Sequence, residues 1–214
     1  MEETIYLSSA YLAPVQYYAK LYQAKKAYIE RYDHYVKQTY RNRCVIAAAD
    51  GPLALTIPTV KSESPKSFMK DVRISDHGNW RHIHWNALVA AYRHSPFFDY
   101  YADDFRRFYE EKYEFLWDFN QELCALICEL IDIHPQFLGT EEYLPDTKSL
   151  GTDFRELIHP KNDFKVSDPS FRAVPYYQVF KEKQGFLSNL SIVDLLFNMG
   201  PESLLVLRDC TKQE

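Results

Sequence analysis

Glycine is scarce in this chain of 214 residues, which contains only six. The sequence has no GxGxxG motif, no GxSxG motif and no P-loop (GxxxxGK followed by Ser or Thr). A phosphate cradle built from glycine backbone is therefore not expected. Any bound anion would have to be held by side chains or by the N-terminus of a helix.

Cysteine and histidine lack the spacings of metal sites. The four cysteines form no CxxC pair and are Cys44, Cys124, Cys128 and Cys210. We expect reduced thiols in the core, with no disulfide and no zinc. The sequence has no HExxH motif, and His82 and His84, two residues apart, do not chelate a metal from one helix. No metal and no cofactor are predicted.

Long apolar runs and an excess of positive charge are also missing. No stretch of about 18 apolar residues exists, so no membrane span is expected. The N-terminus reads MEETIYLSSAYL, with acidic residues where a signal peptide has basic ones. We therefore expect a cytoplasmic protein. The formal net charge of -5 argues against nucleic acid as a partner.

Aromatic residues are abundant, with 17 Tyr, 14 Phe and 3 Trp. Tyrosine combines a flat apolar ring with a hydroxyl, which suits pocket walls that contact sugars, bases or peptides, whereas most Phe should pack in the core. The length fits one domain over residues 1–214, and no internal repeat or linker divides it.

The first part of the chain has the pattern strand, helix, strand. TIYLSS reads as a strand, Pro14 permits a helix to begin, and VQYYAKLYQA has apolar residues at helical spacing before KAYIERYDHY returns to strand character. Such a β–α–β unit favours a parallel sheet. The fold class is therefore predicted as α/β, with this opening, a small mixed sheet and a mostly helical C-terminal half.

Local signals place the remaining elements. We expect a hairpin turn at Asp50–Gly51, a strand over 71–75, a helix from about Asn79 that ends before Pro96, one long or two shorter helices over 102–131, a strand over 141–145, irregular chain over 145–175, and two short helices on either side of Gly200–Pro201.

The stretch KQTYRNR at 37–43 concentrates positive charge in an acidic protein. If the stretch is extended, Lys37, Thr39, Arg41 and Arg43 point to one face; if it is helical, Lys37 and Arg41 still share a face. The cations then form a site for phosphate or carboxylate. Alternatively, they are a solvated face paired with some of the acidic residues.

The stretch NWRHIHW at 79–85 offers a general acid or base. On a helix, Trp80 and His84 lie one turn apart, and the pKa of a histidine beside an indole lies near neutrality. The alternative is a buried His84 that is hydrogen-bonded to backbone while Trp80 packs in the core.

An ordered set of stretches resembles the WbqC-like family of bacterial proteins. These are AYLAPVQYYAKL, YVKQTYRNRCVI, LTIPT, W followed by HW, AYRHSPFFDYY, IHPK and SIVDLLFNMGPE, and they extend from about Tyr6 to about Glu202. Ser9 and Ala10 stand where the family usually has Gln-Pro. This chain therefore lacks that glutamine and any role that the glutamine has in the family. The positions that fall in family motifs are Tyr11, Pro14, Lys37, Arg41, Asn42, Arg43, Trp80, His84, Tyr92, Ser95, Pro96 and Asn198.

The resemblance implies a transferase that adds an aminoacyl or acyl group to an activated sugar during surface-polysaccharide (O-antigen-type) biosynthesis. In this hypothesis His84 is the base, the three cations of KQTYRNR hold phosphates, and Tyr11 and Tyr17 line the sugar pocket. The expected ligand is a phosphorylated or nucleotide-linked sugar, and an oligomer is compatible with the sequence. We further expect KQTYRNR to lie beside the opening around Pro14, so that both line one cleft.

Two alternatives remain open at this point. One is a non-catalytic module that binds a sugar nucleotide or serves as a scaffold in a polysaccharide-assembly pathway. The other is an interaction protein whose aromatic residues form an interface.

Overall fold

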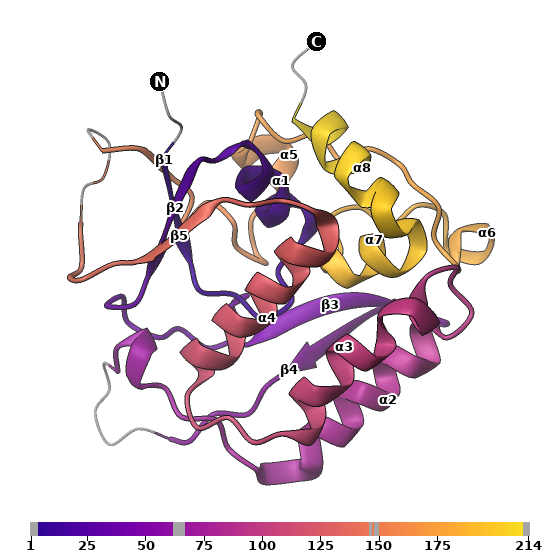
Figure 1. Ribbon diagram of the computed structural model, residues 1–214, viewed down its shortest axis with the longest axis horizontal. Helices are drawn as coiled ribbons and strands as arrows, with labels where there is room; N and C mark the ends of the chain where they lie inside the picture. Colours follow the sequence, from indigo (N-terminus) through magenta and orange to yellow (C-terminus); the bar gives the residue numbers. More distant parts are fainter. Residues whose placement is uncertain (1–3, 62–66, 146, 148–149, 212–214) are drawn as a thin grey trace.

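The computed structural model describes residues 4–61, 67–145, 147 and 150–211. Within them lie two sheets (Figure 1). The larger is parallel with strand order β5-β2-β1-β6 and contains β1 (Thr4–Ser8), β2 (Lys26–Glu30), β5 (Gln136–Gly139) and β6 (Thr152–Asp153). The smaller is the antiparallel pair of β3 (Arg43–Ala48) and β4 (Gly51–Thr56). The predicted α/β class with a small mixed sheet is confirmed.

The β–α–β opening is present as predicted. Strand β1 pairs in parallel with β2, in a register that joins Thr4 to Lys26 and Ser8 to Glu30. Helix α1 (Val15–Gln23) connects them and begins directly after Pro14, whose missing N–H costs nothing at a helix start. The apolar run at the centre of β1 is fully buried, which is typical of a strand covered on both faces.

The two outer strands come from the second half of the chain. Strand β5 pairs with β2, and β6 pairs with β1 through Ile5 to Thr152 and Tyr6 to Asp153. Strands β2 and β5 are thus added on one side of β1, and β6, the last strand in the sequence, is added on its other side. At Gly151 a Cβ atom would lie 2.4 Å from the carbonyl oxygen of Thr4, so only glycine permits this approach of the strands.

Three expectations for the middle of the chain were wrong. The strand expected over 141–145 lies earlier, in β5, and residues 145–175 are not all irregular because they contain β6 and helix α5 (Phe164–Ser167). No strand forms over residues 71–75: Asp71 ends a turn of 3₁₀ helix, and isolated bridges join Ile74 to Thr59 and Arg73 to Phe115. Such short pairings depend on distant partners and leave little periodic signal in the sequence.

Other local signals were read correctly. The Asp50–Gly51 turn joins β3 and β4. The long helical stretch divides into α3 (Phe98–Glu110) and α4 (Leu116–Ile131), with Glu111 in extended backbone between them. The last two helices, α7 (Ile192–Met199) and α8 (Ser203–Cys210), are separated at Gly200, whose φ is +53°. A Cβ there would lie 2.5 Å from the ring of Phe97, which adds a steric reason for glycine.

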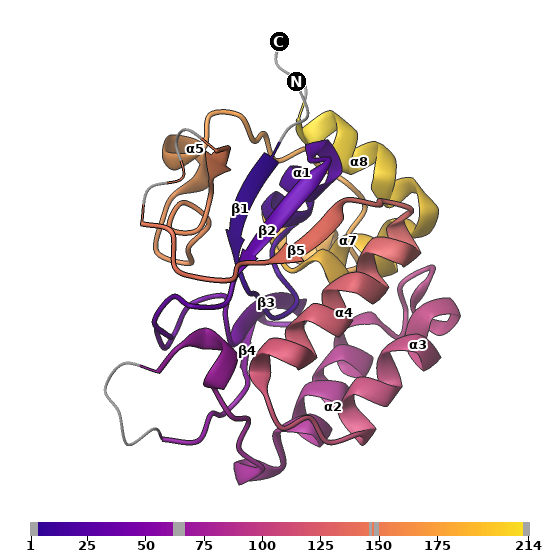
Figure 2. The same ribbon diagram turned by 60° about the vertical axis from the view of Figure 1, so that its left-hand side comes forward.

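The remaining short elements are α6 (Lys181–Gln184) and three turns of 3₁₀ helix at Met69–Asp71, His77–Asn79 and Gly200–Glu202. Figure 2 shows α4 along the parallel sheet and α2 (Trp80–Tyr92) near the β3–β4 hairpin. Helix α3 packs against α2, α4 and α7. The largest fully buried side chains include Tyr11, Tyr18 and Tyr92 as well as Phe105, Phe108, Phe119 and Phe197, so both Tyr and Phe build the core. The four cysteines are buried with free thiols, as predicted.

Across the described residues, no helix has both the length and the apolar character that a membrane crossing requires.

Candidate functional site

The carboxyl ends of the parallel strands carry polar side chains. Strand β1 ends at Ser8, β2 at Glu30 and β6 at Asp153. In open α/β sheets, ligands bind outside the carboxyl ends of the strands, at the point where chain connections leave a strand in opposite directions. Here that point lies between β1 and β6.

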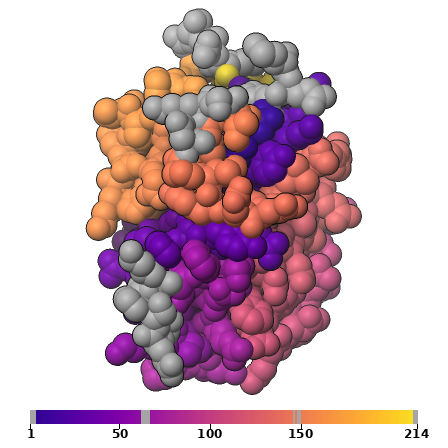
Figure 3. All heavy atoms as spheres, turned by 90° about the vertical axis from the view of Figure 1, so that its left-hand side faces the viewer, coloured from indigo at the N-terminus to yellow at the C-terminus, as the bar shows by residue number. Residues whose placement is uncertain are grey.

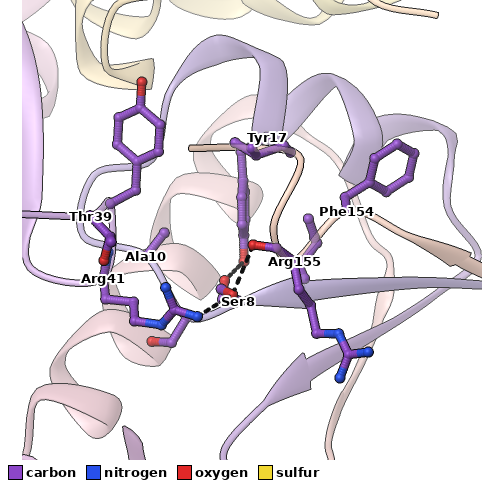
Figure 4. A pocket seen from close by; sticks show the side chains of 11 residues that line it. Ser8, Ala10, Tyr17, Thr39, Arg41, Phe154 and Arg155 are labelled. Carbon is purple, nitrogen blue, oxygen red and sulfur yellow. Dashed lines mark hydrogen bonds between the residues drawn. The ribbon is translucent and has the colours of Figure 1, made fainter. Parts of the chain in front are cut away.

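A narrow slot lies at this point (Figure 4). It is lined by Leu7, Ser8, Ser9, Ala10, Tyr17, Thr39, Tyr40, Arg41, Phe154, Arg155 and Ile158. Its volume of about 10 Å³ is enough for about one water molecule. A second, wider cavity, which we call the outer hollow, shares Arg155 with the slot and has a volume of about 190 Å³. Its lining consists of Asp33, Tyr143, Pro145, Asp153, Arg155, Glu156 and Leu157.

Segments that are far apart in sequence meet here. On the face drawn in Figure 3, the coral and orange surface of residues near 140–160 lies against the violet surface of residues near 30–40. Ser8 links the two sides, because its Oγ accepts a hydrogen bond from Arg41 Nη2 (3.0 Å) and donates one to the carbonyl oxygen of Arg155 (3.2 Å). Tyr17 donates its hydroxyl proton to the carbonyl oxygen of Ser8 (3.1 Å).

Arg41 is buried in an ion pair at the bottom of the site. Its Nε lies 3.1 Å from Asp33 Oδ2, and its Nη2 also donates to that oxygen. The same Nη2 lies 3.6 Å from a carboxylate oxygen of Glu156, which is mostly exposed. Burial raises the pKa of Asp33, and the charge and hydrogen bond of Arg41 only partly offset this effect.

Arg155 forms a second buried pair. Its Nη1 donates to Glu30 Oε2 (2.8 Å), and its Nη2 donates to Asp153 Oδ2 (2.6 Å) and to the carbonyl oxygen of Leu144 (2.8 Å). Glu30 is 0 % exposed and also accepts a hydrogen bond from Thr140 Oγ1 (2.7 Å). Burial alone would raise the pKa of Asp153, but hydrogen bonds from Arg155 lower it. The side chain of Arg155 is therefore held in place on three sides.

Negative charge dominates these two networks. Two arginines, Arg41 and Arg155, face four carboxylates, those of Glu30, Asp33, Asp153 and Glu156, which gives a formal charge of -2 among the described residues of the networks. No group of three His, Cys, Asp or Glu side chains in the described part of the chain is arranged to hold a metal ion. The site is therefore a set of hydrogen-bonding and charged side chains with guanidinium groups at its centre.

The stretch KQTYRNR lies beside the β–α–β opening, as predicted. The backbone N–H of Tyr11 donates to the carbonyl oxygen of Tyr40 (2.8 Å), and both segments line the slot. Residues 37–42 form turns, so neither the side-chain arrangement predicted for a strand nor the one predicted for a helix applies. Lys37 is exposed, Arg41 is buried, and Arg43 begins β3 half-buried. Of these three cations, only Arg41 lines the slot.

His84 lies in an aromatic cluster in the core. Its Nδ1 is 2.9 Å from the hydroxyl of Tyr11, which also hydrogen-bonds to the hydroxyl of Tyr109 (2.9 Å). The ring of Trp80 meets that of His84 edge-on, with centroids 5.1 Å apart. His84 is 3 % exposed, has a backbone hydrogen bond with Thr56, and lines neither the slot nor the outer hollow. This geometry matches the alternative of a buried, backbone-bonded histidine, and the catalytic role stays a prediction.

The other predicted site residues lie in separate places. Tyr92 donates its hydroxyl to buried Asp194 (2.9 Å), and Ser95 Oγ donates to the carbonyl oxygen of Tyr92 at the end of α2 (2.7 Å). Asn42 Nδ2 donates to the carbonyl oxygen of Ile57 (2.9 Å). Pro14 caps α1. The structure thus brings together Tyr17, Arg41 and the backbone before Tyr11. Of the other predicted residues, Lys37 is exposed and Arg43 is half-buried, and the rest lie in the core.

Sequence reasoning missed the acidic half of the site and Arg155. Glu30 ends a predicted strand and Asp33 follows it closely, so the rule for carboxyl ends of parallel strands would have found both. Asp153 ends a strand of only two residues and Arg155 follows it, and the sequence has no comparable signal for so short a strand.

The position of His84 leads to a prediction on pH. Burial lowers the pKa of His84 from 6.5 to about 4, against the opposing hydrogen bond with Thr56. The unfolded chain then binds this proton at a higher pH than the folded protein, so the His84 contribution to stability is complete above pH 6.5 and is lost as the pH falls to about 4. His84→Gln should shrink the loss of unfolding free energy between pH 7 and pH 4 by about 3 kcal/mol.

Urea unfolding at the two pH values measures this difference. The exposed His82, two residues away, provides the control, because His82→Gln makes the same change of residue outside the core. An equal loss in wild type and His84→Gln would show that His84 is protonated as readily in the folded protein as in the unfolded chain.

Comparisons with known proteins place the chain in a family. The sequence profile of the WbqC-like protein family matches residues 9–159, which include the lining of the outer hollow and that of the slot except Leu7 and Ser8. "Uncharacterized protein Rv1507c" of Mycobacterium tuberculosis (strain ATCC 25618 / H37Rv) is 30% identical over 202 residues, covering 82% of this chain and 84% of that protein. No solved structure matched the chain. With most of its length matched, the chain belongs to the WbqC-like protein family.

Proposed function

We propose that the protein is a transferase that acts on an activated sugar in bacterial surface-polysaccharide biosynthesis, with the sugar ring seated in the outer hollow. The observation that carries this proposal is the position of the slot and the outer hollow. Both lie at the carboxyl edge of the parallel sheet, at the topological switch point between β1 and β6. Membership of the WbqC-like family supports the polysaccharide context.

The lining suits a ring with several hydroxyl groups. Arginine and carboxylate side chains offer donors and acceptors side by side, and Tyr143 provides a flat wall that is 52 % exposed. The guanidinium of Arg155 lies 5.5 Å from the centre of that ring and fixes the wall at one edge. Small-molecule sites commonly combine an aromatic surface with a few precisely placed polar groups.

Phosphate groups of the ligand belong outside the outer hollow. Arg41 and Arg155 are already paired with carboxylates, and the formal charge of -2 repels a phosphate. Lys37, exposed on the turn segment that reaches the slot, is the proposed partner of the phosphates, together with Arg43. The Nε of Arg43 is buried and has no hydrogen-bond partner among the described residues.

Asp33 is the proposed base for the transfer step. It lines the outer hollow, and burial raises its pKa, which makes its carboxylate a stronger proton acceptor. A hydroxyl or amine of the sugar would lose its proton to Asp33 and form a bond to the carbonyl carbon of an acyl thioester or acyl phosphate. The bond from that carbon to the thiolate or phosphate breaks, and the leaving group keeps the electron pair.

Burial of His84 favours the second candidate, a non-catalytic module that binds a sugar nucleotide. The side chain first predicted as the base is enclosed in the core and lines neither the slot nor the outer hollow. Binding requires only the outer hollow and the cations, whereas catalysis also requires a base next to the ligand. Measuring transfer in wild type and Asp33→Asn separates the two candidates, because the first predicts a transfer activity that the variant loses, whereas the second predicts no transfer activity even in wild type.

Thermal shift with a panel of nucleotide sugars tests binding. A ligand at 100 times its dissociation constant adds about 2.7 kcal/mol to the unfolding free energy. Tyr143→Ala should weaken binding about fivefold, because it removes the aromatic wall. Tyr177 is equally exposed (52 %) and lines neither the slot nor the outer hollow, so Tyr177→Ala is the matched control and should bind as wild type does.

Two results would contradict the proposal. One is a panel in which no nucleotide sugar or free sugar raises the melting temperature. The other is equal weakening of binding by Tyr143→Ala and Tyr177→Ala, which would place the ligand elsewhere on the molecule.

A further inference from the structure

We infer that the sugar recognised in the outer hollow carries a free amino group, whose ammonium form pairs with Asp33 and Glu156. This inference rests on the proposed function and names the substrate class of the same site, an amino sugar. It follows from an unused buried acceptor, from the charge of the two ion-pair networks and from the place of each carboxylate.

The unused acceptor belongs to Asp33. This residue is only 8 % exposed, and its Oδ2 receives both hydrogen bonds from Arg41. Its Oδ1 is buried and finds no hydrogen-bond partner in the described part of the chain. A buried carboxylate oxygen without a donor is costly, by about 1–3 kcal/mol or more for a charged group, and nearly all such atoms in folded proteins have partners. A ligand donor in the outer hollow, which Asp33 lines, would supply the missing partner.

The other carboxylates divide into satisfied and available ones. Both oxygens of Asp153 accept hydrogen bonds from Arg155, and Oδ2 also accepts one from Thr147. Glu30 is enclosed and paired with Arg155. Glu156 touches Arg41 only at 3.6 Å and has a side chain that is 82% exposed, so it is free to turn toward a ligand. Asp33 and Glu156 are therefore the two acceptors that line the outer hollow and remain available.

Charge then selects the kind of donor. The two networks have a formal charge of -2, and both arginines already have carboxylate partners. His159 interacts electrostatically with Glu156 and with Lys161. Neither His159 nor Lys161 lines the outer hollow. A neutral hydroxyl would satisfy Asp33 Oδ1 and leave the charge unchanged. An ammonium group would satisfy the same oxygen, reach Glu156 and reduce the excess negative charge, which makes a charge-assisted hydrogen bond about twice as strong.

The rest of the lining calls for a ring beside the ammonium. Tyr143, Pro145 and Leu157 contribute apolar surface to the same lining as the carboxylates. A small cation alone would leave this surface unused, whereas the carbon face of a pyranose packs against an aromatic ring. An amino sugar therefore fits both parts of the outer hollow.

Calorimetric titration of the full chain with four probes tests the inference: D-glucosamine, D-glucose, N-acetyl-D-glucosamine and methylamine. D-glucosamine should bind at least tenfold more tightly than D-glucose. N-acetyl-D-glucosamine should resemble D-glucose, because acetylation removes the charge. Methylamine should bind far more weakly than D-glucosamine, because it carries the charge without the ring.

Variants assign the effect to the named carboxylates. Glu156→Gln changes an exposed side chain and should reduce the preference for D-glucosamine over D-glucose about threefold, while the fold is retained. Asp33→Asn should abolish the preference, and circular dichroism checks that this variant is folded. Glu202→Gln, an exposed position in the turn before α8, is the matched control and should keep the full preference.

The possible failures are distinct. Equal affinity for D-glucosamine and D-glucose overturns the amino-sugar inference and leaves the proposed sugar site standing. Equal affinity for methylamine and D-glucosamine overturns it as well, since the ring would then contribute nothing. Absence of binding by all three sugars, together with no effect of nucleotide sugars, removes the proposed function itself.

Discussion

Arg155→Met is expected to lower the unfolding free energy by about 3–5 kcal/mol, as measured by urea denaturation at neutral pH. Methionine keeps much of the apolar length of the side chain but removes the guanidinium. Glu30, which is 0 % exposed, then loses its salt-bridge partner at 2.8 Å and, among the described residues, retains hydrogen bonds from Thr140 and the backbone N–H of Tyr32. A buried charge without its counter-charge is the main source of the loss.

A double variant separates this cause from simple loss of packing. Glu30→Gln combined with Arg155→Met removes both charges and should recover most of the stability, to within about 1–2 kcal/mol of wild type. Arg208, whose pair with Asp209 is exposed, provides the control: Arg208→Met should change the stability by about 0.5 kcal/mol or less. A double variant as unstable as Arg155→Met would show that burial of the Glu30 charge is not what destabilises the protein.

Asp194→Ala is expected to have an effect of similar size, a loss of about 3–5 kcal/mol. Asp194 is 0 % exposed and lies in α7. Its carboxylate accepts hydrogen bonds from Tyr92 (2.9 Å), Tyr176 (2.7 Å) and Gln178 (2.7 Å). Burial raises its pKa even though these three hydrogen bonds act to lower it. Alanine would leave three buried donors without an acceptor, each at a cost of about 1–3 kcal/mol.

Asp194→Asn tests whether the acceptor or the charge matters. The amide retains one acceptor oxygen but introduces an NH₂ group among donors, so we expect an intermediate loss of about 2 kcal/mol. Asp104 lies on the exposed face of α3, and Asp104→Ala should stay within about 0.5 kcal/mol of wild type. If Asp194→Ala were as stable as Asp104→Ala, water would have to replace the carboxylate, and Tyr92 would regain its place as a candidate ligand-binding residue.

The parts of the fold that were predicted are those with local causes. The β–α–β opening follows from Pro14 between an apolar strand and an amphipathic helix, and the hairpin follows from Asp50–Gly51. Strand β6 could not be predicted, because two residues have no periodicity and are defined only by their pairing with β1. The strand in β5 was shifted for the same reason, since its partner β2 lies far away in sequence.

The site was predicted to a similar extent. The contact between KQTYRNR and the opening was expected, because parallel strands bring their carboxyl ends together. The partners of Arg41 and Arg155 were not, since Glu30 and Arg155 are 125 residues apart and meet only through the order of the strands. His84 illustrates a different limit: a histidine among aromatic residues on a helix can face either a pocket or the core, and its sequence neighbours are the same in both cases.

The position of β1 at the centre of the sheet also sets an order of events during synthesis. Its pairing with β2 forms early and needs only a short loop closure, whereas its other edge waits for Thr152 and Asp153. Until that segment leaves the ribosome, the backbone N–H and C=O groups on one side of Thr4–Ser8 have no strand partner, and an open strand edge of this kind is prone to pair with other chains. Contacts between such distant residues raise the contact order and slow folding. The nascent chain is therefore most vulnerable to aggregation between the completion of the opening and the emergence of residues 152–155, which close the sheet through β6 and the site through Arg155.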